Sequence, residues 1–255
     1  MPEMPAPTIT TSRCSDMATR YQHGVECVNT LSNFSTSCKV TAVTAVSSNR
    51  TSRGRRSARP SGDDRELAIL TTAKRLLEER SFADISVDDL AKGAGLSRPT
   101  FYFYFKSKEA VLLSLLEPMI VRADAEFDGA VQRLPADPRR VWRNGIKAFF
   151  TGFGSHRAVV RAGSEALATS SEVRAVWTSF MQKWIDQTAA MIGAERARGA
   201  APETIPAADL ATSLNQMNER AMMATLFAEQ PSVNEDRVVD TLTHIWVTSI
   251  YGEGT

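Results

Sequence analysis

An aromatic stretch, RPTFYFYF at residues 98–105, carries the side chains of this sequence whose chemistry is most informative. Phe101 and Phe105 are four residues apart and would share one face of a helix. The residues left on the outward faces are Arg98, Thr100, Tyr102 and Tyr104. A cation, hydroxyl groups and flat amphipathic rings suit a DNA duplex, because they can bind phosphates and contact thymine methyl groups. The alternative is an aromatic stripe buried in a core, which helical spacing alone also allows.

The residues before this stretch favour DNA binding, because they predict a helix-turn-helix. Ser86 can cap a first helix, with the acid Asp89 three residues later. Gly95 lets the chain reach a positive φ and leave that helix sharply. Ser97 can then cap the second helix, and Pro99 lies in its first turn, where a missing N–H costs nothing.

The segment GLSRPTFYFYFKSKEAVL resembles the DNA-binding segment of the TetR family of bacterial transcriptional regulators. The positions that match the family pattern are Gly95, Leu96, Ser97, Thr100, Phe101, Tyr102, Tyr104, Phe105, Ser107, Lys108 and Glu109. A match over so many spaced positions is far more specific than a bare helix-turn-helix. Similarity to one member of the family extends over about residues 53–253 and does not include the first fifty residues.

A basic arm ahead of the helix-turn-helix is a second candidate for contact with DNA. Residues 1–60 carry eight basic and three acidic side chains, so this segment has a charge of +5 and the rest of the chain −4. Arg55 and Arg56 lie near its end, where they can follow phosphates or enter a minor groove. The alternative is a charged segment that is merely solvated. The position of the segment beside the helix-turn-helix favours an arm that contacts DNA.

The predicted DNA-binding residues are Arg55, Arg56, Ser97, Arg98, Pro99, Thr100, Tyr102, Tyr104 and Lys108. We expect Arg98, Thr100 and Tyr102 to contact bases or the nearby backbone of the duplex. We expect Ser97, Tyr104 and Lys108 to bind phosphates.

Residues 1–60 are rich in Ser, Thr and Ala without a sustained period, so we expect this segment to be disordered. It contains Cys14, Cys27 and Cys38, whose spacing fits no zinc site, so we expect reduced thiols in a cytoplasmic protein and no metal or cofactor. Its polar residues interrupt every candidate for a secretory signal. Because the family resemblance begins near Arg53, we expect the leading residues to come from an overlong start-codon assignment, which the intact mass of the native protein would test.

The hydrophobic periodicity predicts an all-α, TetR-like chain with a three-helix DNA-binding unit at residues 61–106 and a larger helical domain at residues 107–255. The first helix should begin after Ser61 and bury Leu67, Ile69, Leu70, Ala73, Leu76 and Leu77. A long helix should run from Ser107 to about Leu134 and contain Pro118. Further helices are predicted at about Arg139–Ser155, Arg157–Ala168, Ser171–Gly199, Ala207–Glu229 and Asn234–Tyr251. No stretch has the roughly 20 apolar residues of a membrane span.

The larger domain concentrates aromatic residues at helical spacing, which indicates either a plain core or a ligand cavity. Asn215 and Asn218 favour the cavity, because they lie on an apolar face and a ligand carbonyl could pair with a buried amide. Gly145 also removes side-chain volume from an aromatic helix. The family resemblance implies a long apolar channel that binds hydrophobic ligands. The predicted ligand-binding residues are Phe127, Trp142, Gly145, Phe149, Phe153, Trp177, Met181, Trp184, Thr188, Asn215, Asn218 and Trp246.

The last two predicted helices should form a homodimer interface. The resemblance implies that they pair into a four-helix bundle, and a two-fold dimer suits a helix-turn-helix because one copy reads few bases. Their apolar stripes are Leu210, Leu214, Val238, Leu242, Ile245 and Trp246. Some of these residues must face the core of the monomer, and the sequence leaves the division open.

An enzyme is not indicated, because the sequence has no nucleophile elbow, no phosphate-binding loop and no histidine paired with a cysteine or carboxylate. We predict a ligand-responsive homodimeric repressor that a hydrophobic small molecule releases from double-stranded operator DNA. The similarity to one family member further implies control of a monooxygenase gene. The alternative is a DNA-binding repressor with a filled core and no effector.

Overall fold

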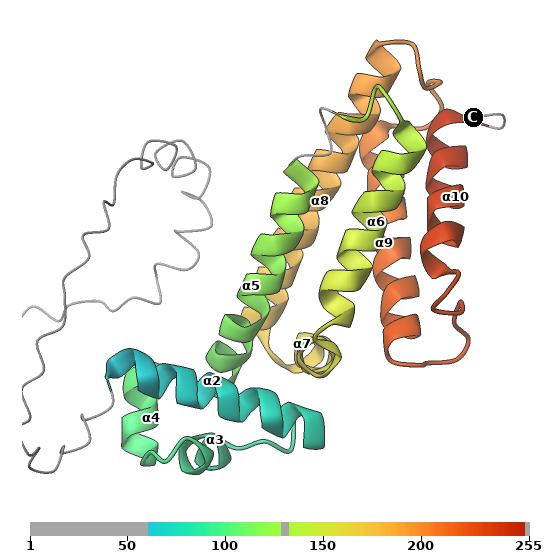
Figure 1. Ribbon diagram of the computed structural model, residues 1–255. Coiled ribbons are helices and arrows are strands. Elements are labelled where there is room, and N and C mark those ends of the chain that lie inside the picture. Colours follow the sequence, from blue (N-terminus) through green and yellow to red (C-terminus); the bar gives the residue numbers. More distant parts are fainter. Residues whose placement is uncertain (1–60, 129–132, 253–255) are drawn as a thin grey trace, which may run out of the picture. The chain divides into compact units, whose positions relative to one another are not determined.

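The computed structural model describes residues 61–128 and 133–252, and within that part only the backbone of residues 126–128. All regular secondary structure in these ranges is helical, which confirms the predicted all-α class there (Figure 1). The helices are α2 (Gly62–Glu79), α3 (Val87–Gly93), α4 (Arg98–Tyr104), α5 (Lys108–Asp128), α6 (Pro138–Gly154), α7 (Arg157–Thr169), α8 (Ser171–Ala197), α9 (Ala207–Leu226) and α10 (Val238–Tyr251). The basic arm with Arg55 and Arg56 lies outside the described residues, as do the three cysteines.

Local capping sets where α2, α3 and α4 begin, as the sequence predicts. Ser61 and Ser86 each form a complete capping box with the aspartate three residues later. Ser97 accepts a hydrogen bond from the backbone N–H of Thr100 at 3.3 Å. After α3, Gly95 has a φ of +68° and supplies the sharp turn. Each of these devices spans three or four residues, so the sequence alone could specify it.

Helices α2, α3 and α4 contribute to one hydrophobic core. The buried face of α2 consists of Ile69, Thr72, Ala73, Leu76 and Leu77, and it packs on α3 and α5. The prediction that Leu67 belongs to this face is wrong, since its side chain is 63 % exposed. Leu67 lies two residues, or about 200°, from Ile69 on the helix, so it points away from the buried stripe. Gly93 lets α3 approach α2 closely, because a Cβ there would collide with Thr72.

Helix α5 connects the unit of α2, α3 and α4 to the rest of the protein, since it packs on α2 as well as on α6, α7 and α8. It contains Pro118 as predicted, but its described part ends at Asp128 rather than near Leu134. Arg133 and Leu134 lie in a short turn ahead of α6. In the larger domain α8 packs on α9, and α10 lies beside α6 (Figure 1).

The stripes expected at a dimer interface mostly face the core of the monomer. Leu210, Leu214, Val238, Leu242 and Trp246 are all buried within the single chain. The reason is that α9 uses its apolar face against α8, and α10 uses its apolar face against α6. Of the six residues only Ile245 is partly exposed. No described helix combines the length and the apolar character needed to cross a membrane.

Candidate functional site

Helix α4 divides its aromatic residues between the core and solvent. Phe101 is completely buried, whereas the Tyr102 ring is 45 % exposed. Arg98 and Pro99 are exposed beside Tyr102, and Thr100 and Tyr104 are partly exposed, so the predicted outward set does reach the surface. The interpretation of the whole stretch as a core stripe is therefore wrong for this face of α4.

Phe103 is a residue of this surface that the pattern analysis missed. Its side chain is 83 % exposed and its ring meets that of Tyr104 edge-on, with centroids 5.2 Å apart. The helical period could have found it, because Phe103 is two residues from the buried Phe101 and so lies on the opposite side of α4. An exposed phenyl ring on this helix can contact only apolar groups, such as a thymine methyl or a sugar.

Arg98 is held in place by protein groups on both sides. One guanidinium nitrogen lies 3.5 Å from a carboxylate oxygen of Asp88, on α3, and another donates to the hydroxyl of Tyr102 at 3.3 Å. The hydrogen bond to Tyr102, followed by electrostatic attraction to Tyr102 and Asp88, raises the pKa of Arg98. The cation at the start of α4 is thus positioned ahead of any contact with a phosphate.

Lys108 occupies a different place from the one expected. Its ammonium group donates to the backbone carbonyls of Phe82 at 2.8 Å, Ile85 at 2.9 Å and Ala83 at 3.3 Å. It also lies 4.5 Å from the centroid of the Phe82 ring. Because all three donors of an ammonium group are used in this way, Lys108 stabilises the loop between α2 and α3 rather than presenting a charge to a phosphate.

The aromatic residues of α6 and α8 meet in the larger domain, as the family resemblance implies. Phe149 stacks on Phe153 with ring centroids 4.4 Å apart and meets Trp184 edge-on at 4.2 Å. A cavity of about 50 Å³ lies against this cluster. The predicted ligand residues that line it are Trp142, Gly145, Phe149, Met181, Trp184, Asn215, Asn218 and Trp246.

A second cavity of about 40 Å³ lies between α5, α6, α7, α8 and α9. Phe153 and Trp177 line it, together with Leu116 of α5 and Gly163 of α7. Thr188 lines neither cavity, and the side chain of Phe127 is outside the described atoms. The described residues therefore form two small cavities where a long channel is expected, and each has room for only a few water molecules, since one water needs about 10–15 Å³ of such space.

Every tryptophan of the chain directs its indole N–H to an acceptor within the protein. Trp142 donates to the Tyr251 hydroxyl, Trp177 to Glu219, Trp184 to Asp124 and Trp246 to Asn218, over 2.7 to 3.2 Å. Since the polar edges of the rings are used in this way, the apolar faces remain to form the cavity walls. Sequence spacing gave no sign of these partners, which come from other helices.

The two asparagines also have partners within the protein. The amide nitrogen of Asn215 donates to the Thr188 hydroxyl at 3.2 Å and to the Ala211 carbonyl at 2.9 Å. The carbonyl oxygen of Asn218 accepts the indole N–H of Trp246 at 2.9 Å. Both asparagines line the first cavity, so they shape its wall while their hydrogen bonds hold α8, α9 and α10 together.

Glu219 is a further cavity residue that the sequence analysis did not select. It follows Asn218 on α9, is partly buried, and lines both cavities. Its carboxylate accepts the indole N–H of Trp177 at 2.7 Å. Burial raises the pKa of Glu219, and that hydrogen bond offsets only part of the rise. A carboxyl group between two apolar cavities is unusual enough to be a candidate for binding.

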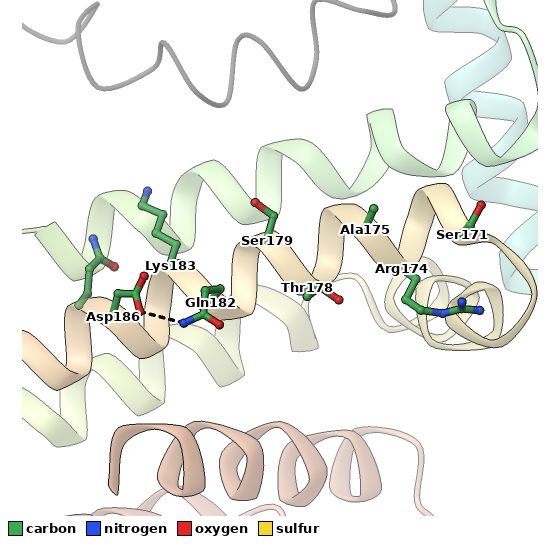
Figure 2. Close-up of a pocket in the computed structure, with 9 residues that line it drawn as sticks. Ser171, Arg174, Ala175, Thr178, Ser179, Gln182, Lys183 and Asp186 are labelled. Carbon is green, nitrogen blue, oxygen red and sulfur yellow. Dashed lines mark hydrogen bonds between the residues drawn. The ribbon is translucent and has the colours of Figure 1, made fainter. Parts of the chain in front are cut away.

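A more voluminous concave surface, about 930 Å³, runs along α8. Figure 2 shows its described lining side chains, all of them from that one helix, with Gln182 bonded to Asp186. Its described lining is almost entirely polar or charged, whereas the two cavities are lined mainly by apolar and aromatic side chains, so the cavities are the better candidate. In the described part of the chain no three histidine, cysteine or acidic side chains are grouped to hold a metal ion.

Comparison with known families gives two matches that divide the chain in the same way as these two sites. The model described as "Bacterial regulatory proteins, tetR family" matches residues 69–115. The model described as "Transcriptional regulator EthR, C-terminal domain" matches residues 142–252.

Individual proteins extend these matches over most of the chain. The HTH-type transcriptional regulator EthR of Mycolicibacterium smegmatis is 68 % identical over 210 residues, which cover 82 % of this chain and 97 % of that protein. EthR of Mycobacterium tuberculosis is 66 % identical over 203 residues, covering 79 % and 94 %. The member that the sequence resembles beyond the family pattern is thus EthR, as predicted.

Solved structures support the fold at much lower identity. NalD of Pseudomonas aeruginosa, titled the secondary repressor of the MexAB-OprM multidrug efflux pump, has a TM-score of 0.61 at 14 % identity, covering 76 % of this chain and 100 % of that chain. FadR of Thermus thermophilus, titled a TetR-family repressor in complex with lauroyl-CoA, has a TM-score of 0.52 at 19 % identity, covering 74 % and 95 %. These likenesses confirm the predicted TetR-like fold.

Proposed function

Because this chain belongs to the TetR family of transcriptional regulators and within it resembles EthR, it is a DNA-binding regulator and not an enzyme, and we propose that it is a homodimeric repressor released from its operator by a hydrophobic small molecule. One observation carries this proposal. The second cavity is bordered by α5 and α7, which are also the two larger-domain helices packed against α2 of the DNA-binding unit.

In the proposed division, residues 61–106 bind DNA and residues 107–255 bind the ligand and the second subunit. Arg98, Thr100 and Tyr102 of α4 contact bases and their nearby backbone, with Phe103 added on thymine methyl groups. Ser97 and Tyr104 bind phosphates, and the Arg55–Arg56 arm adds affinity that depends on salt. Lys108 is left out, since its ammonium group is bound to three backbone carbonyls.

The second subunit is proposed to pair through the outer faces of α9 and α10. A dimer places two copies of α4 in successive major grooves, and the distance between them decides operator affinity. The protein acts in the cytoplasm, where operator DNA is found. The target gene implied by the resemblance to EthR is a monooxygenase gene.

Ligand and DNA are coupled through contacts between the second cavity and α2. Leu116 of α5 packs closely against Gly163 of α7. A Cβ at position 163 would lie only 3.3 Å from the Cδ1 of Leu116. On the same α7, Glu165 accepts the backbone N–H of Phe82, just after α2, at 3.0 Å. A ligand that widens this cavity therefore moves helices bonded to the DNA-binding unit, and it favours the dimer whose spacing no longer fits DNA.

One structural relative is titled with a ligand that carries an apolar chain: FadR of Thermus thermophilus is described in complex with lauroyl-CoA. The small volume of the present cavities favours a second candidate, a repressor with a filled core and no effector. Drug-sized ligands need about 300 Å³ or more, so an effector would have to open the cavities by moving rings such as Phe153.

The test is fluorescence anisotropy of the protein on DNA upstream of its own and its neighbouring gene, across salt and with a panel of apolar ligands. We expect tight, sequence-specific binding that one class of ligand reverses. Specific binding that no ligand alters would support the filled-core repressor. No specific binding at any salt would rule out both candidates.

Tyr102→Ala sharpens this test, because Tyr102 is exposed and its removal should leave the fold intact. We expect operator affinity to fall at least about tenfold, with Tyr102→Phe in between because it keeps the ring and loses the hydroxyl. Unchanged operator affinity of Tyr102→Ala would show that α4 is not the recognition helix.

A further inference from the structure

The guanidinium group of Arg98 on α4 is held by a carboxylate from the neighbouring helix α3. One of its nitrogens lies 3.5 Å from a carboxylate oxygen of Asp88, and the two side chains are 58 % and 49 % exposed. Its carbon lies 5.8 Å from the centroid of the Tyr102 ring, whose hydroxyl accepts a hydrogen bond from another of its nitrogens. An ion pair as exposed as this one contributes little to stability, because water screens it. Its position beside the residues proposed to contact DNA suggests a role in binding instead.

Helix capping does not account for Asp88. Helix α3 begins after Ser86, and the acid of its capping box is Asp89. The Asp89 carboxylate accepts the backbone N–H of Ser86 at 3.0 Å and its hydroxyl at 2.7 Å. Asp88 is the other acid of the first turn, where any carboxylate gains a modest attraction to the helix dipole. What distinguishes Asp88 is therefore its pairing with Arg98, a residue of a different helix.

A carboxylate near a DNA-binding surface opposes the binding of a duplex, because it carries the same charge as the phosphates. Asp88 and Tyr102 each engage one nitrogen of the Arg98 guanidinium group, which has five N–H donors in a rigid plane. The remaining donors can bind an acceptor in one direction while both partners stay in place. To follow a phosphate elsewhere, Arg98 would have to leave Asp88, and an unpaired carboxylate would then face the duplex.

We propose that Asp88 determines the specificity of DNA binding, because it holds Arg98 toward one acceptor of the operator and away from the phosphates of other DNA. On the operator that acceptor, a base edge or the phosphate beside it, lies where the held guanidinium group points, so the ion pair is kept. On other sequences contact with a phosphate costs the ion pair. This inference rests on the proposed placement of α4 on DNA and is independent of the ligand response.

The test compares wild type and Asp88→Asn, as full chains without ligand, by fluorescence anisotropy on two duplexes of equal length. One is the DNA upstream of the protein's own gene, and the other is a shuffled sequence of the same composition. At about 0.1 M salt we expect affinity for the shuffled duplex to rise about three- to tenfold, because Arg98 is free to bind one more phosphate. The slope of log affinity against log salt on that duplex should become steeper by up to about 0.9. Affinity for the upstream DNA should change by less than about twofold, so the specificity ratio falls.

The matched control is Asp63→Asn, because Asp63 occupies the same second position of α2 that Asp88 occupies in α3. It should leave the specificity ratio unchanged. In an Arg98→Ala background, Asp88→Asn should have no further effect on either duplex. A rise that persists in that background, or that Asp63→Asn also produces, would be a general effect of charge and would overturn the proposal. An equal rise on both duplexes, or no rise on either, would overturn it too. Asp88→Ser also removes the charge and should give the same result if Asp88→Asn does not fold.

Failure of this proposal can be told apart from failure of the proposed function. If α4 does not lie on DNA, Arg98→Ala should change affinity for neither duplex. If α4 lies on DNA but Asp88 has no part in specificity, Arg98→Ala should weaken binding to the upstream DNA while Asp88→Asn leaves the specificity ratio unchanged.

Discussion

The helix starts of the DNA-binding unit and the cavity walls of the larger helical domain are set by polar contacts of very different sequence range. In α2, α3 and α4 the capping bonds of Ser61, Ser86 and Ser97 join residues three apart. In the larger domain Trp142 and Tyr251 are 109 residues apart, and Trp184 and Asp124 are 60 apart. A recognition surface can thus be specified locally, whereas a ligand cavity depends on helices that meet only in the folded chain.

The two regions also differ in whether the residues proposed to bind a partner are the ones that stabilise the fold. On α4 the candidate DNA contacts point to solvent and contribute little to the core, so the two roles are separable residue by residue. Around the cavities the same rings form both the core and the walls. Substitutions on α4 should therefore change either stability or DNA binding. Substitutions around the cavities should change stability and ligand binding together.

The largest effect is expected from two phenylalanines two residues apart on α4. Phe101→Ala should lower the free energy of unfolding by about 3–5 kcal/mol, because its ring is fully buried. Phe103→Ala should change that free energy by less than about 0.5 kcal/mol, because its ring is 83 % exposed, and should weaken operator binding. Urea denaturation and anisotropy measure the two quantities. Equal losses of stability would contradict the division of α4 into a buried and a reading face.

The next largest effect distinguishes a basic residue that stabilises the fold from basic residues that bind phosphates. Lys108→Met should cost about 1.5–3 kcal/mol of stability, since it leaves three loop carbonyls without their charged donor. At conditions where it is folded, its operator binding should keep the wild-type dependence on salt.

Arg98→Ala and the double change Arg55→Ala with Arg56→Ala should instead leave stability nearly unchanged. Each lost phosphate contact should reduce the slope of log affinity against log salt by about 0.9. An unchanged slope for the double variant would mean that the arm does not lie on DNA, and a reduced slope for Lys108→Met would return that residue to the interface.

In the larger domain stability and binding should change together. Asn218→Ala removes the acceptor of the Trp246 indole, so we expect a loss of about 1 kcal/mol in stability. The effector response should weaken as well, while operator affinity without ligand stays the same. Asn144→Ala, at an exposed position of α6, is the control and should alter neither. A normal effector response in a destabilised Asn218→Ala would separate the two roles after all.

The smallest effect is a change of stability with pH. Burial raises the pKa of Glu219 above the usual value of 4.5 for a glutamate, so folding favours its protonated form. The stability it contributes is complete below the unfolded pKa and is lost as pH rises through the folded pKa. Glu219→Gln does not titrate, so its melting temperature should be slightly above that of the wild type at pH 7, and the difference should shrink toward pH 4. A difference that grows toward low pH would contradict the direction of the shift.

Several features of the candidate sites followed from the sequence because they depend on helical period alone. The burial of Phe101 and the exposure of Tyr102 are examples, and Phe103 could have been predicted in the same way. The aromatic residues of α6 and α8 were also predicted to converge, and they do. Period does not identify the partner of a side chain, which is why Lys108 was predicted on a phosphate and lies instead on the loop after α2.

The sequence by itself determined the class of the fold, the starts of α2, α3 and α4 and the outward face of α4, because capping bonds and helical faces are set within a few residues. It did not determine the start of α10, which was predicted at Asn234 and lies at Val238. Only the tertiary structure decided how α9 and α10 divide their apolar residues, since Leu214 and Leu242 become core only when α8 and α6 cover them. It alone placed Glu219 between two cavities and gave each tryptophan its acceptor. The physical reason is that a cavity is the space left between side chains of several helices, and no single stretch of sequence contains all of its walls.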